Sequence, residues 1–222
     1  MVQRKLVVKK LGLVEYARAL EIQKTTERAV QTGAQADTLF LLEHPHTLTI
    51  GRRGDKSAVL IPEDALAARG ITLFETNRGG KITYHGLGQI VGYPIINLSP
   101  DREDVHRYVR DLEEVLIRTM SDFGIQAFRI KGLTGVHTSE GKIAAIGVHI
   151  ARWVTTHGFA LNVYTDLSFF DLIIACEGEP VTSMQELLRK DLTMDEVGDR
   201  IVENFLTVFE MEKLKETEVI VG

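Results

Sequence analysis

Apolar residues in the first third of the chain predict one helix and several short strands. Residues 14–32 carry apolar side chains at helical spacing, and this pattern stops before Gly33. Residues 5–8, 38–42 and 71–75 are short apolar runs of the length that strands have. The run at residues 38–42 is almost continuously apolar, so it predicts a buried strand.

A second helix is predicted in the middle of the chain, where Ser99 would cap its start and Pro100 would occupy the first helical position. The apolar residues that follow share one helical face: Val105, Tyr108, Val109, Leu112, Leu116 and Phe123. Two long β-like runs come next, residues 142–150 and residues 153–163. Together these patterns predict a helix followed by a pair of strands.

Near the end of the chain, Thr193 and Glu196 have the spacing of a capping box. It predicts a final helix whose core face is Val197, Ile201, Phe205 and Phe209. Because helices and strands do not alternate strictly, the pattern favours an α+β fold with a mixed or antiparallel sheet flanked by helices. No repeat, low-complexity segment or linker interrupts residues 1–222, so we expect a single domain.

Composition excludes several classes of protein. The 222 residues are 44% apolar and 26% charged, which excludes a disordered or collagen-like chain. The net charge of −5 leaves no basic footprint for nucleic acid or an anionic membrane. Lys9 and Lys10 interrupt the apolar run at the start, and no later window is apolar enough to span a membrane. We therefore expect a cytoplasmic protein whose partners are metabolites or other proteins.

The densest candidate chemistry lies in residues 77–94, a stretch with five glycines. Glycine lets a ligand approach the backbone closely. The hydrogen-bonding side chains in this stretch are Arg78, Lys81, Thr83, His85 and Gln89. The spacing matches neither a dinucleotide fingerprint nor a Walker motif. Two interpretations remain, a ligand-binding loop and a glycine-rich hairpin with a polar outer face.

Lys142 stands at the entrance to an apolar strand, beside the small residues Ala144, Ala145 and Gly147. Small residues on a strand often mark a close approach by a ligand or by backbone. The alternative is a solvated lysine at a strand end. His157 interrupts the following β pattern, and it is either a catalytic histidine or a buried one satisfied by hydrogen bonds.

Cys176 is the single cysteine, so the chain has no internal disulfide and no cysteine-rich metal site. It ends an apolar run and precedes a loop-like Glu-Gly-Glu-Pro segment, where either a core residue or a nucleophile fits. His44 and His46 flank a proline, but no third ligand follows at a recognisable spacing. We therefore expect no metal site.

Three segments and the cysteine together resemble one family. They read RGGxxTYHGxGQxxxYP from Arg78, KIAAIGV from Lys142 and HGFALN from His157, followed by Cys176. In this order, over about residues 39–187, they are similar to the lipoyl(octanoyl) transferases. The resemblance implies the biotin/lipoate protein ligase fold and an acyltransferase that needs no cofactor. It implies octanoyl transfer from acyl carrier protein to a lysine on lipoyl domains of 2-oxoacid dehydrogenases or on the glycine-cleavage H protein.

The resemblance also implies roles for individual residues. Cys176 matches the nucleophile that forms an acyl thioester, and Lys142 matches the lysine that lowers the pKa of that thiol. His157 would support the site. The substrate-binding segments would comprise Arg78, Gly79, Gly80, Lys81, Ile82, Thr83, Tyr84, His85, Ala145, Ile146, Gly147, Gly158, Phe159 and Ala160. Leu87, Ala175 and Glu177 depart from the usual family pattern, so the resemblance does not fix the rigidity of these loops or the acyl-chain preference.

Two other functions stay open from sequence alone. One is an ATP-dependent lipoate or biotin ligase of the same fold, which would not need Cys176. The other is a non-catalytic acyl-binding or carrier-interaction module. Arg52, Arg53 and Lys56 form a basic cluster that either meets an acidic carrier protein or belongs to an ordinary exposed loop.

Overall fold

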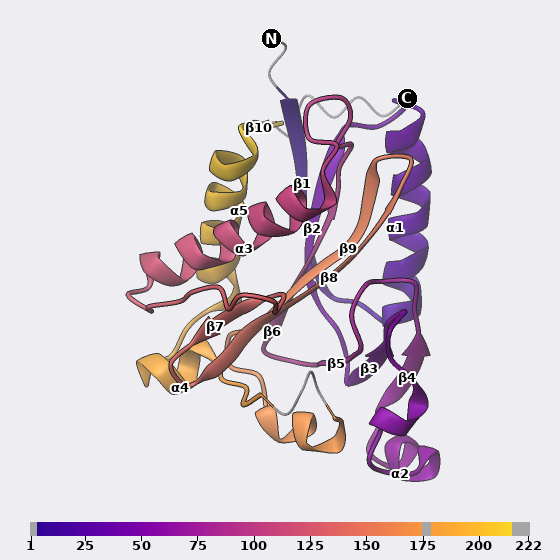
Figure 1. The fold of residues 1–222 in the computed structure, drawn as a ribbon, viewed down its shortest axis with the longest axis vertical. Coiled ribbons are helices and arrows are strands. Elements are labelled where there is room, and N and C mark those ends of the chain that lie inside the picture. Colours follow the sequence, from indigo (N-terminus) through magenta and orange to yellow (C-terminus); the bar gives the residue numbers. More distant parts are fainter. Residues whose placement is uncertain (1–3, 175–178, 215–222) are drawn as a thin grey trace.

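A mixed seven-stranded sheet runs through the molecule in the computed structural model, which describes residues 4–174 and 179–214 (Figure 1). The strand order is β10-β1-β2-β6-β9-β8-β7. Strand β1 is parallel to β2 and β10, and the other neighbours are antiparallel. The sheet thus confirms the predicted α+β class. The strands are β1 (Arg4–Leu13), β2 (Asp37–Glu43), β6 (Gln89–Ile95), β7 (Val136–Thr138), β8 (Gly141–Ala151), β9 (Val154–Asn162) and β10 (Met211–Lys213).

Helices cover both faces of this sheet because successive strand side chains point to opposite faces. Leu39 and Leu41 of β2 pack into the core beneath α3 and α5, whereas Phe40 and Leu42 pack with α1. No described helix, in residues 4–174 or 179–214, has the length and apolar character needed to cross a membrane. The helices are α1 (Tyr16–Gln31), α3 (Val105–Asp122), α5 (Met194–Phe209) and the short α4 (Met184–Leu188).

A smaller three-stranded sheet, of order β4-β3-β5, lies beside the large one and has its own apolar core (Figure 1). Leu48, Leu66 and Ile82 are almost fully buried in that core. The small sheet holds residues 76–81, the loop between β4 and β5, against the large sheet. Its elements are β3 (Thr47–Ile50), η1 (Lys56–Ala58), α2 (Glu63–Ala68), β4 (Thr72–Glu75), β5 (Ile82–His85) and η2 (Leu167–Leu172).

The predicted capping box at the last helix is confirmed. The Thr193 hydroxyl accepts a bond from the Glu196 backbone N–H at 3.2 Å, and the Glu196 carboxylate accepts from the Thr193 N–H at 3.1 Å. The predicted core face is fully buried: Val197, Ile201, Phe205 and Phe209. The two predicted long strands are also present, as the β8–β9 hairpin.

The predicted start of the middle helix at Ser99 and Pro100 is wrong. Helix α3 begins at Val105, after a turn, and Asp104 caps it by accepting a hydrogen bond from the Arg107 N–H at 3.0 Å. Both serine-proline and aspartate are helix-start signals, and only the course of the turn decides between them. The later start leaves Val105 45% exposed at the first turn of the helix.

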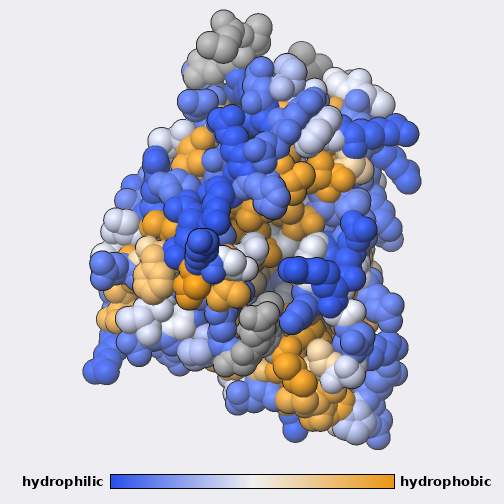
Figure 2. Space-filling view, in the orientation of Figure 1, coloured by the Kyte–Doolittle hydropathy of each residue, from blue (hydrophilic) through white to orange (hydrophobic). Residues whose placement is uncertain are grey.

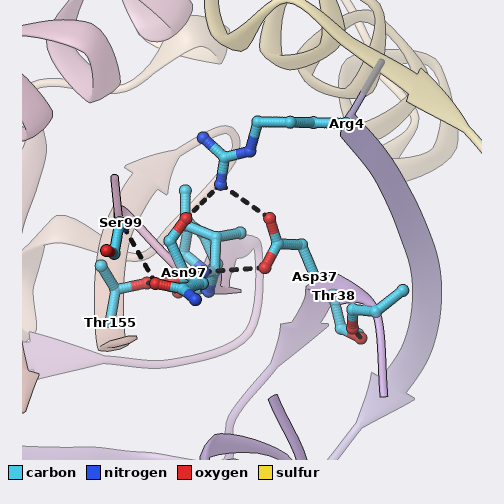
Figure 3. A network of polar contacts seen from close by, with 9 residues as sticks. Arg4, Asp37, Thr38, Asn97, Ser99 and Thr155 are labelled. Carbon is cyan, nitrogen blue, oxygen red and sulfur yellow. Dashed lines mark hydrogen bonds and ion pairs between the residues drawn. The ribbon is translucent and has the colours of Figure 1, made fainter. Parts of the chain in front are cut away.

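One polar network ties together β1, β2 and the segment that follows β6 at an end of the large sheet (Figure 3). The Arg4 guanidinium donates to the Asp37 carboxylate at 2.8 Å and to the Asn97 carbonyl oxygen. The Asn97 N–H donates to the other Asp37 oxygen at 2.7 Å. Burial raises the pKa of Asp37 from its ordinary value, although Arg4 and Asn97 counteract this effect. Asp37 therefore joins the start of β1 to the segment that follows β6.

Candidate active site

A cavity of about 420 Å³ lies where the small sheet meets the β8–β9 hairpin. Its wall is built from the β4–β5 loop, β5, β8, β9, the start of α3 and residues 132–134. Figure 2 shows apolar surface recessed between hydrophilic side chains near the middle of this face. Loops and strands both contribute polar groups to the wall, including Arg78 from the β4–β5 loop, His85 from β5 and Lys142 from β8.

The structure brings three sequence-distant segments of the predicted site together around this cavity. They meet because β9 pairs with both β6 and β8, while the small sheet delivers the β4–β5 loop. The predicted residues that line the cavity are Arg78, Gly79, Gly80, Lys81, Ile82, Thr83, His85, Lys142, Ala145, Ile146, Gly147, His157, Gly158, Phe159 and Ala160.

Tyr84 does not line the cavity, although it belongs to the predicted substrate-binding segment. Side chains alternate along β5, so Thr83 and His85 face the cavity while Tyr84 points into the small core. There its hydroxyl bonds to His46 Nδ1 at 2.7 Å, and its ring stacks on Phe169. The contacts of Tyr84 are therefore with the core of the small sheet.

Cys176 lies outside the described residues, but the chain on both sides of it is anchored near the cavity. The Ile174 N–H donates to the Ala58 carbonyl oxygen at 2.8 Å. On the other side, the Lys142 N–H donates to the Pro180 carbonyl oxygen at 2.8 Å, and the Thr182 N–H donates to the Lys142 carbonyl oxygen at 3.1 Å. The segment that follows Cys176 is thus paired directly with the strand that carries Lys142.

Two loops beside the cavity are hydrogen-bonded along their backbones. The N–H groups of Gly51, Arg52 and Arg53 donate to carbonyl oxygens of the β4–β5 loop at 2.7–3.1 Å. The Gly79 N–H then donates to the Val148 carbonyl oxygen of β8 at 2.9 Å. These bonds fix both loops to the edge of the large sheet, so the cavity mouth is held in shape by backbone.

Gly147 confirms the predicted close approach of backbone to the small-residue strand. A Cβ atom at Gly147 would lie 2.8 Å from the Gly79 carbonyl oxygen and 3.2 Å from the Arg78 side chain. Gly92 has a similar role on β6, because its Cβ would collide with the Phe159 ring. Small residues in this site therefore make room for neighbouring protein atoms.

Arg78 places a buried positive charge at the cavity wall. Its guanidinium donates to the Thr49 hydroxyl at 2.9 and 3.1 Å and to the Gly79 carbonyl oxygen at 2.9 Å. Burial lowers the pKa of His157 to about 3, and the charge of Arg78 contributes to this shift. Burial likewise lowers the pKa of His85 well below its ordinary value, with His44 and Arg78 contributing. Both histidines are therefore neutral at pH 7.

A chain of side-chain hydrogen bonds runs from His85 to the segment beyond Cys176. His85 Nδ1 donates to Gln89 Oε1 at 2.8 Å, and Gln89 Nε2 donates to Asn162 Oδ1 at 2.9 Å. Asn162 Nδ2 donates to the Thr182 carbonyl oxygen at 3.0 Å. Gln89 was named from sequence only as a hydrogen-bonding side chain of the glycine-rich stretch, and the role of Asn162 was missed, although both lie within the resembling motifs. This chain links β5 to the strand pair that holds Lys142.

His157 is buried and hydrogen-bonded to side chains on two other elements. Its backbone N–H donates to Gln23 Oε1 of α1 at 2.7 Å, and its Nε2 bonds to Asn77 Oδ1 at 2.8 Å. Its φ of 58° is in the left-handed region, which non-glycine residues seldom occupy. The structure therefore shows a buried, satisfied histidine that also lines the cavity, and its support of catalysis stays a prediction.

Several cavity residues were not among the site residues predicted from the sequence. Tyr16 and Tyr93 face the site from α1 and β6, and burial raises the pKa of Tyr16 to about 12. Val105, Val109 and Leu133 supply apolar wall from outside the sheet. Tyr16, Val105, Val109 and Leu133 lie outside the glycine-rich motif and the other resembling segments, so only tertiary contact could identify them, whereas Tyr93 lies within the motif that begins at Arg78.

The two histidines around Pro45 are engaged in protein contacts. His44 Nδ1 donates to the Val14 carbonyl oxygen at 2.6 Å, and His44 Nε2 accepts from the Tyr93 hydroxyl at 2.8 Å. His46 stacks on Phe169, with ring centroids 4.3 Å apart. Within the described part of the chain, no three acidic, histidine or cysteine side chains are grouped so that they could hold a metal ion.

Comparison with solved structures identifies the fold. A bi-partite lipoate protein ligase from Thermoplasma acidophilum aligns with a TM-score of 0.74 at 18% identity, over 98% of this chain and 89% of that one. A biotin protein ligase from Aquifex aeolicus, solved with biotin and ATP, aligns with a TM-score of 0.54 at 13% identity, over 93% and 70%. The fold class is therefore that of the lipoate and biotin protein ligases, as the resemblance implied.

Comparison of sequences narrows the class. The family model described as the lipoyl protein ligase A/B catalytic domain matches residues 15–206. A protein of Solibacter usitatus named octanoyltransferase is 51% identical over 212 residues, covering 95% of this chain and 96% of that protein. This chain belongs to the lipoyl protein ligase A/B catalytic domain family and, within it, to the octanoyltransferases. The expectation of an acyltransferase is thereby confirmed.

Proposed function

We propose that the protein moves an octanoyl group from an acyl carrier protein, through a thioester on Cys176, to a lysine of a lipoyl domain. The observation that carries this proposal is the backbone pairing of Lys142 with Pro180 and Thr182 at the wall of a partly apolar cavity. Glu179, which also lines the cavity, is three positions after Cys176, and three residue steps span at most about 10 Å. The proposal requires Cys176 to lie near the cavity, and its short connection to Glu179 allows this.

The apolar wall suits an eight-carbon chain. Ile146, Val148 and Phe159 from the hairpin face Val109 and Leu133 around one part of the cavity. Burying about seven methylene or methyl groups at roughly 0.8 kcal/mol each gives at most about 5–6 kcal/mol before ordering costs. Affinity of this size would hold the acyl group while its thioester reacts.

Thiolate formation alone does not explain a need for Lys142. A thiol of ordinary pKa, about 8.5, is only about 3% thiolate at pH 7, and lowering its pKa to about 6.5 raises that fraction roughly 25-fold. The accompanying loss of basicity costs about eightfold in nucleophilicity, so only about a threefold gain remains. We therefore assign Lys142 a second task, the transfer of protons.

The proposed steps balance as follows. The Cys176 thiol gives its proton to Lys142, and the thiolate attacks the carbonyl carbon of the donor thioester. The bond from that carbon to the carrier sulfur breaks, and the carrier thiolate takes the proton from Lys142. The amine of the acceptor lysine then attacks the enzyme thioester, its surplus proton passes by way of Lys142 to the departing Cys176 thiolate, and an amide forms. The need for a reduced thiol supports a cytoplasmic location.

Intact-mass spectrometry tests the proposed intermediate directly. Incubation with octanoyl-acyl carrier protein should add one octanoyl group to the parent chain, and hydroxylamine should remove it. The Cys176→Ser variant should form no hydroxylamine-sensitive adduct. Addition of an apo lipoyl domain or apo H protein should move the group to the acceptor. Transfer that occurs only from free octanoate with ATP would instead identify a ligase, and no adduct at any carrier concentration would contradict the thioester route.

A basic rim supports an acidic carrier as the donor. Arg52 and Arg53 are exposed on the hydrogen-bonded loop at the cavity mouth, whereas Lys56 pairs with Glu63 at 3.1 Å. We expect Arg52→Glu to raise KM for octanoyl-acyl carrier protein about tenfold at low salt, because like charges repel an acidic partner. The effect should shrink as salt screens the charges. Lys56→Glu is the matched control, and an equal rise in KM for both variants would contradict a specific role for the rim.

A further inference from the structure

His137 is a buried histidine that no step above uses. It lies on β7 directly opposite Lys142 on β8, and its side chain is almost fully buried. His137 Nε2 is 3.3 Å from Glu179 Oε2, and Glu179 is the first described residue after Cys176. This contact is a side-chain hydrogen bond. It joins β7, which pairs with the strand of Lys142, to the segment that follows Cys176.

The other ring nitrogen of His137 has an unusual environment. Among the described residues, His137 Nδ1 is one of few buried side-chain atoms without a hydrogen-bond partner. Leaving a buried polar atom unpaired costs free energy, so an apolar side chain would be favoured here if packing were the only requirement. The bond of His137 to Glu179 therefore points to a role at the site beyond packing.

Close to His137, the backbone of Gly135 leaves little space around the Lys142 side chain. A Cβ atom at Gly135 would lie 2.7 Å from Lys142 Cε and 3.4 Å from Lys142 Nζ. The Gly135 N–H donates to the buried Glu113 carboxylate at 3.1 Å. Glu113 in turn pairs with two arginines of α3 and the following loop, Arg110 at 2.9 Å and Arg129 at 3.0 Å. The lysine thus lies against backbone that a buried ion-pair network holds in place.

Three charged groups act on His137. Burial lowers its pKa from the ordinary value and Lys142 lowers it further, while Glu179 and Glu113 counteract the shift. A neutral imidazole that donates from Nε2 to Glu179 satisfies this arrangement. The carboxylate of Glu179 is thereby held on the same side of β8 as the Lys142 side chain.

We propose that His137 is a positioning residue whose bond to Glu179 holds the segment after Cys176 in register with Lys142. This inference rests on the proposed function, because the register matters only if the two residues act on one thioester. The bond between β7 and Glu179 adds a side-chain tie to the backbone bonds of Lys142 with Pro180 and Thr182. Loss of the bond should slow acyl transfer onto the enzyme while the cavity still binds the donor.

Rapid-quench mass spectrometry of the first acylation, with octanoyl-acyl carrier protein in excess, tests the role of His137. We expect His137→Leu to lower the acylation rate 10- to 100-fold with less than a threefold change in the donor concentration for half-maximal rate. His137→Gln, whose amide can still donate to Glu179, should recover the rate to within about threefold of the parent. The Glu179→Ala variant should slow acylation as His137→Leu does, and combining the two should add little further loss.

Two further comparisons separate the possible outcomes. Glu140→Gln removes an exposed carboxylate from the turn between β7 and β8 and should leave the acylation rate unchanged. Parent-like acylation by His137→Leu, or independent multiplication of the His137 and Glu179 effects, would overturn the positioning role. A fall in melting temperature that His137→Gln reverses without restoring the rate would also overturn it. No acylation of the parent chain would instead refute the proposed function.

Discussion

Replacing Lys142 with alanine should reduce octanoyl transfer by about 10²- to 10⁴-fold, the range that a positioned acid–base group supplies. The residue lines the cavity, and its backbone is bonded to the segment that follows Cys176. The thiolate fraction accounts for only about threefold of the loss at neutral pH, because lower basicity offsets most of the gain. The remainder is expected from proton transfer to and from the two thiols and the acceptor amine.

Arginine separates the two tasks of Lys142. Lys142→Arg keeps a positive charge beside the thiol, but a guanidinium does not release its proton in this pH range. We expect Lys142→Arg to react with iodoacetamide at Cys176 nearly as fast as the parent and yet to transfer octanoyl at least tenfold more slowly. Lys131→Ala, an exposed lysine beside the loop that lines the cavity, is the control. Full recovery of Lys142→Ala on raising the pH would show that pKa lowering suffices.

Acid should destabilise the protein steeply below pH 6.5, well before its carboxylates titrate. Burial lowers the pKa of His44 to about 4 and that of His157 to about 3, and His85 shifts in the same direction. The ordinary pKa of histidine in an unfolded chain is about 6.5. Below that pH the unfolded state therefore binds protons that the folded state does not bind. The stability from the neutral rings is therefore complete above pH 6.5 and is lost as pH falls towards the folded values.

The size of this effect follows from linkage. Between pH 6.5 and pH 5, each histidine that stays neutral only in the folded state costs about 2 kcal/mol. For a chain of this length that corresponds to a fall of roughly 4–8 °C in melting temperature per histidine. Protonating His44 adds a proton at Nε2, the atom that accepts from the Tyr93 hydroxyl. The loss should therefore include the bond between these two residues.

Urea unfolding at pH 8, 7, 6 and 5 measures this dependence. The parent should lose about 2 kcal/mol per histidine across the lower part of the range, and His44→Gln should show a slope smaller by about one proton. At pH 8 all three rings are neutral in both states, so the difference between parent and His44→Gln there reports packing and hydrogen bonds alone. An identical slope for parent and variant would contradict the assignment of His44 as a buried neutral ring.

Local sequence patterns predicted most of the long elements because their signals are complete within a few turns. The capping box of Thr193 and Glu196 determines where α5 begins, and the almost continuous apolar run at residues 38–42 predicts the buried strand β2. The predicted start of α3 was wrong because two capping signals, Ser99 and Asp104, lie five residues apart. Short elements such as β7 and β10 carry too few residues for a period to be recognised.

The candidate site divides in the same way. The groups proposed to react, Cys176 and Lys142, and the glycine-rich loop could be named from motifs, because the proposed chemistry requires particular residue types in order along the chain. Their spatial arrangement could not be read from sequence. Tyr84 belongs to the motif and yet faces the small core, since alternation along β5 leaves only its neighbours towards the cavity.

By itself, the sequence determined the family and the α+β class, and it named the residues proposed to react. Only the tertiary structure decided that the backbone of Lys142 hydrogen-bonds to Pro180 and Thr182. It also decided that Gly147 leaves space for Arg78 and Gly79. It also decided that His137 lies opposite Lys142 and contacts Glu179. The physical reason is that these contacts join residues far apart in the chain, so their geometry depends on strand pairing and packing across the whole sheet.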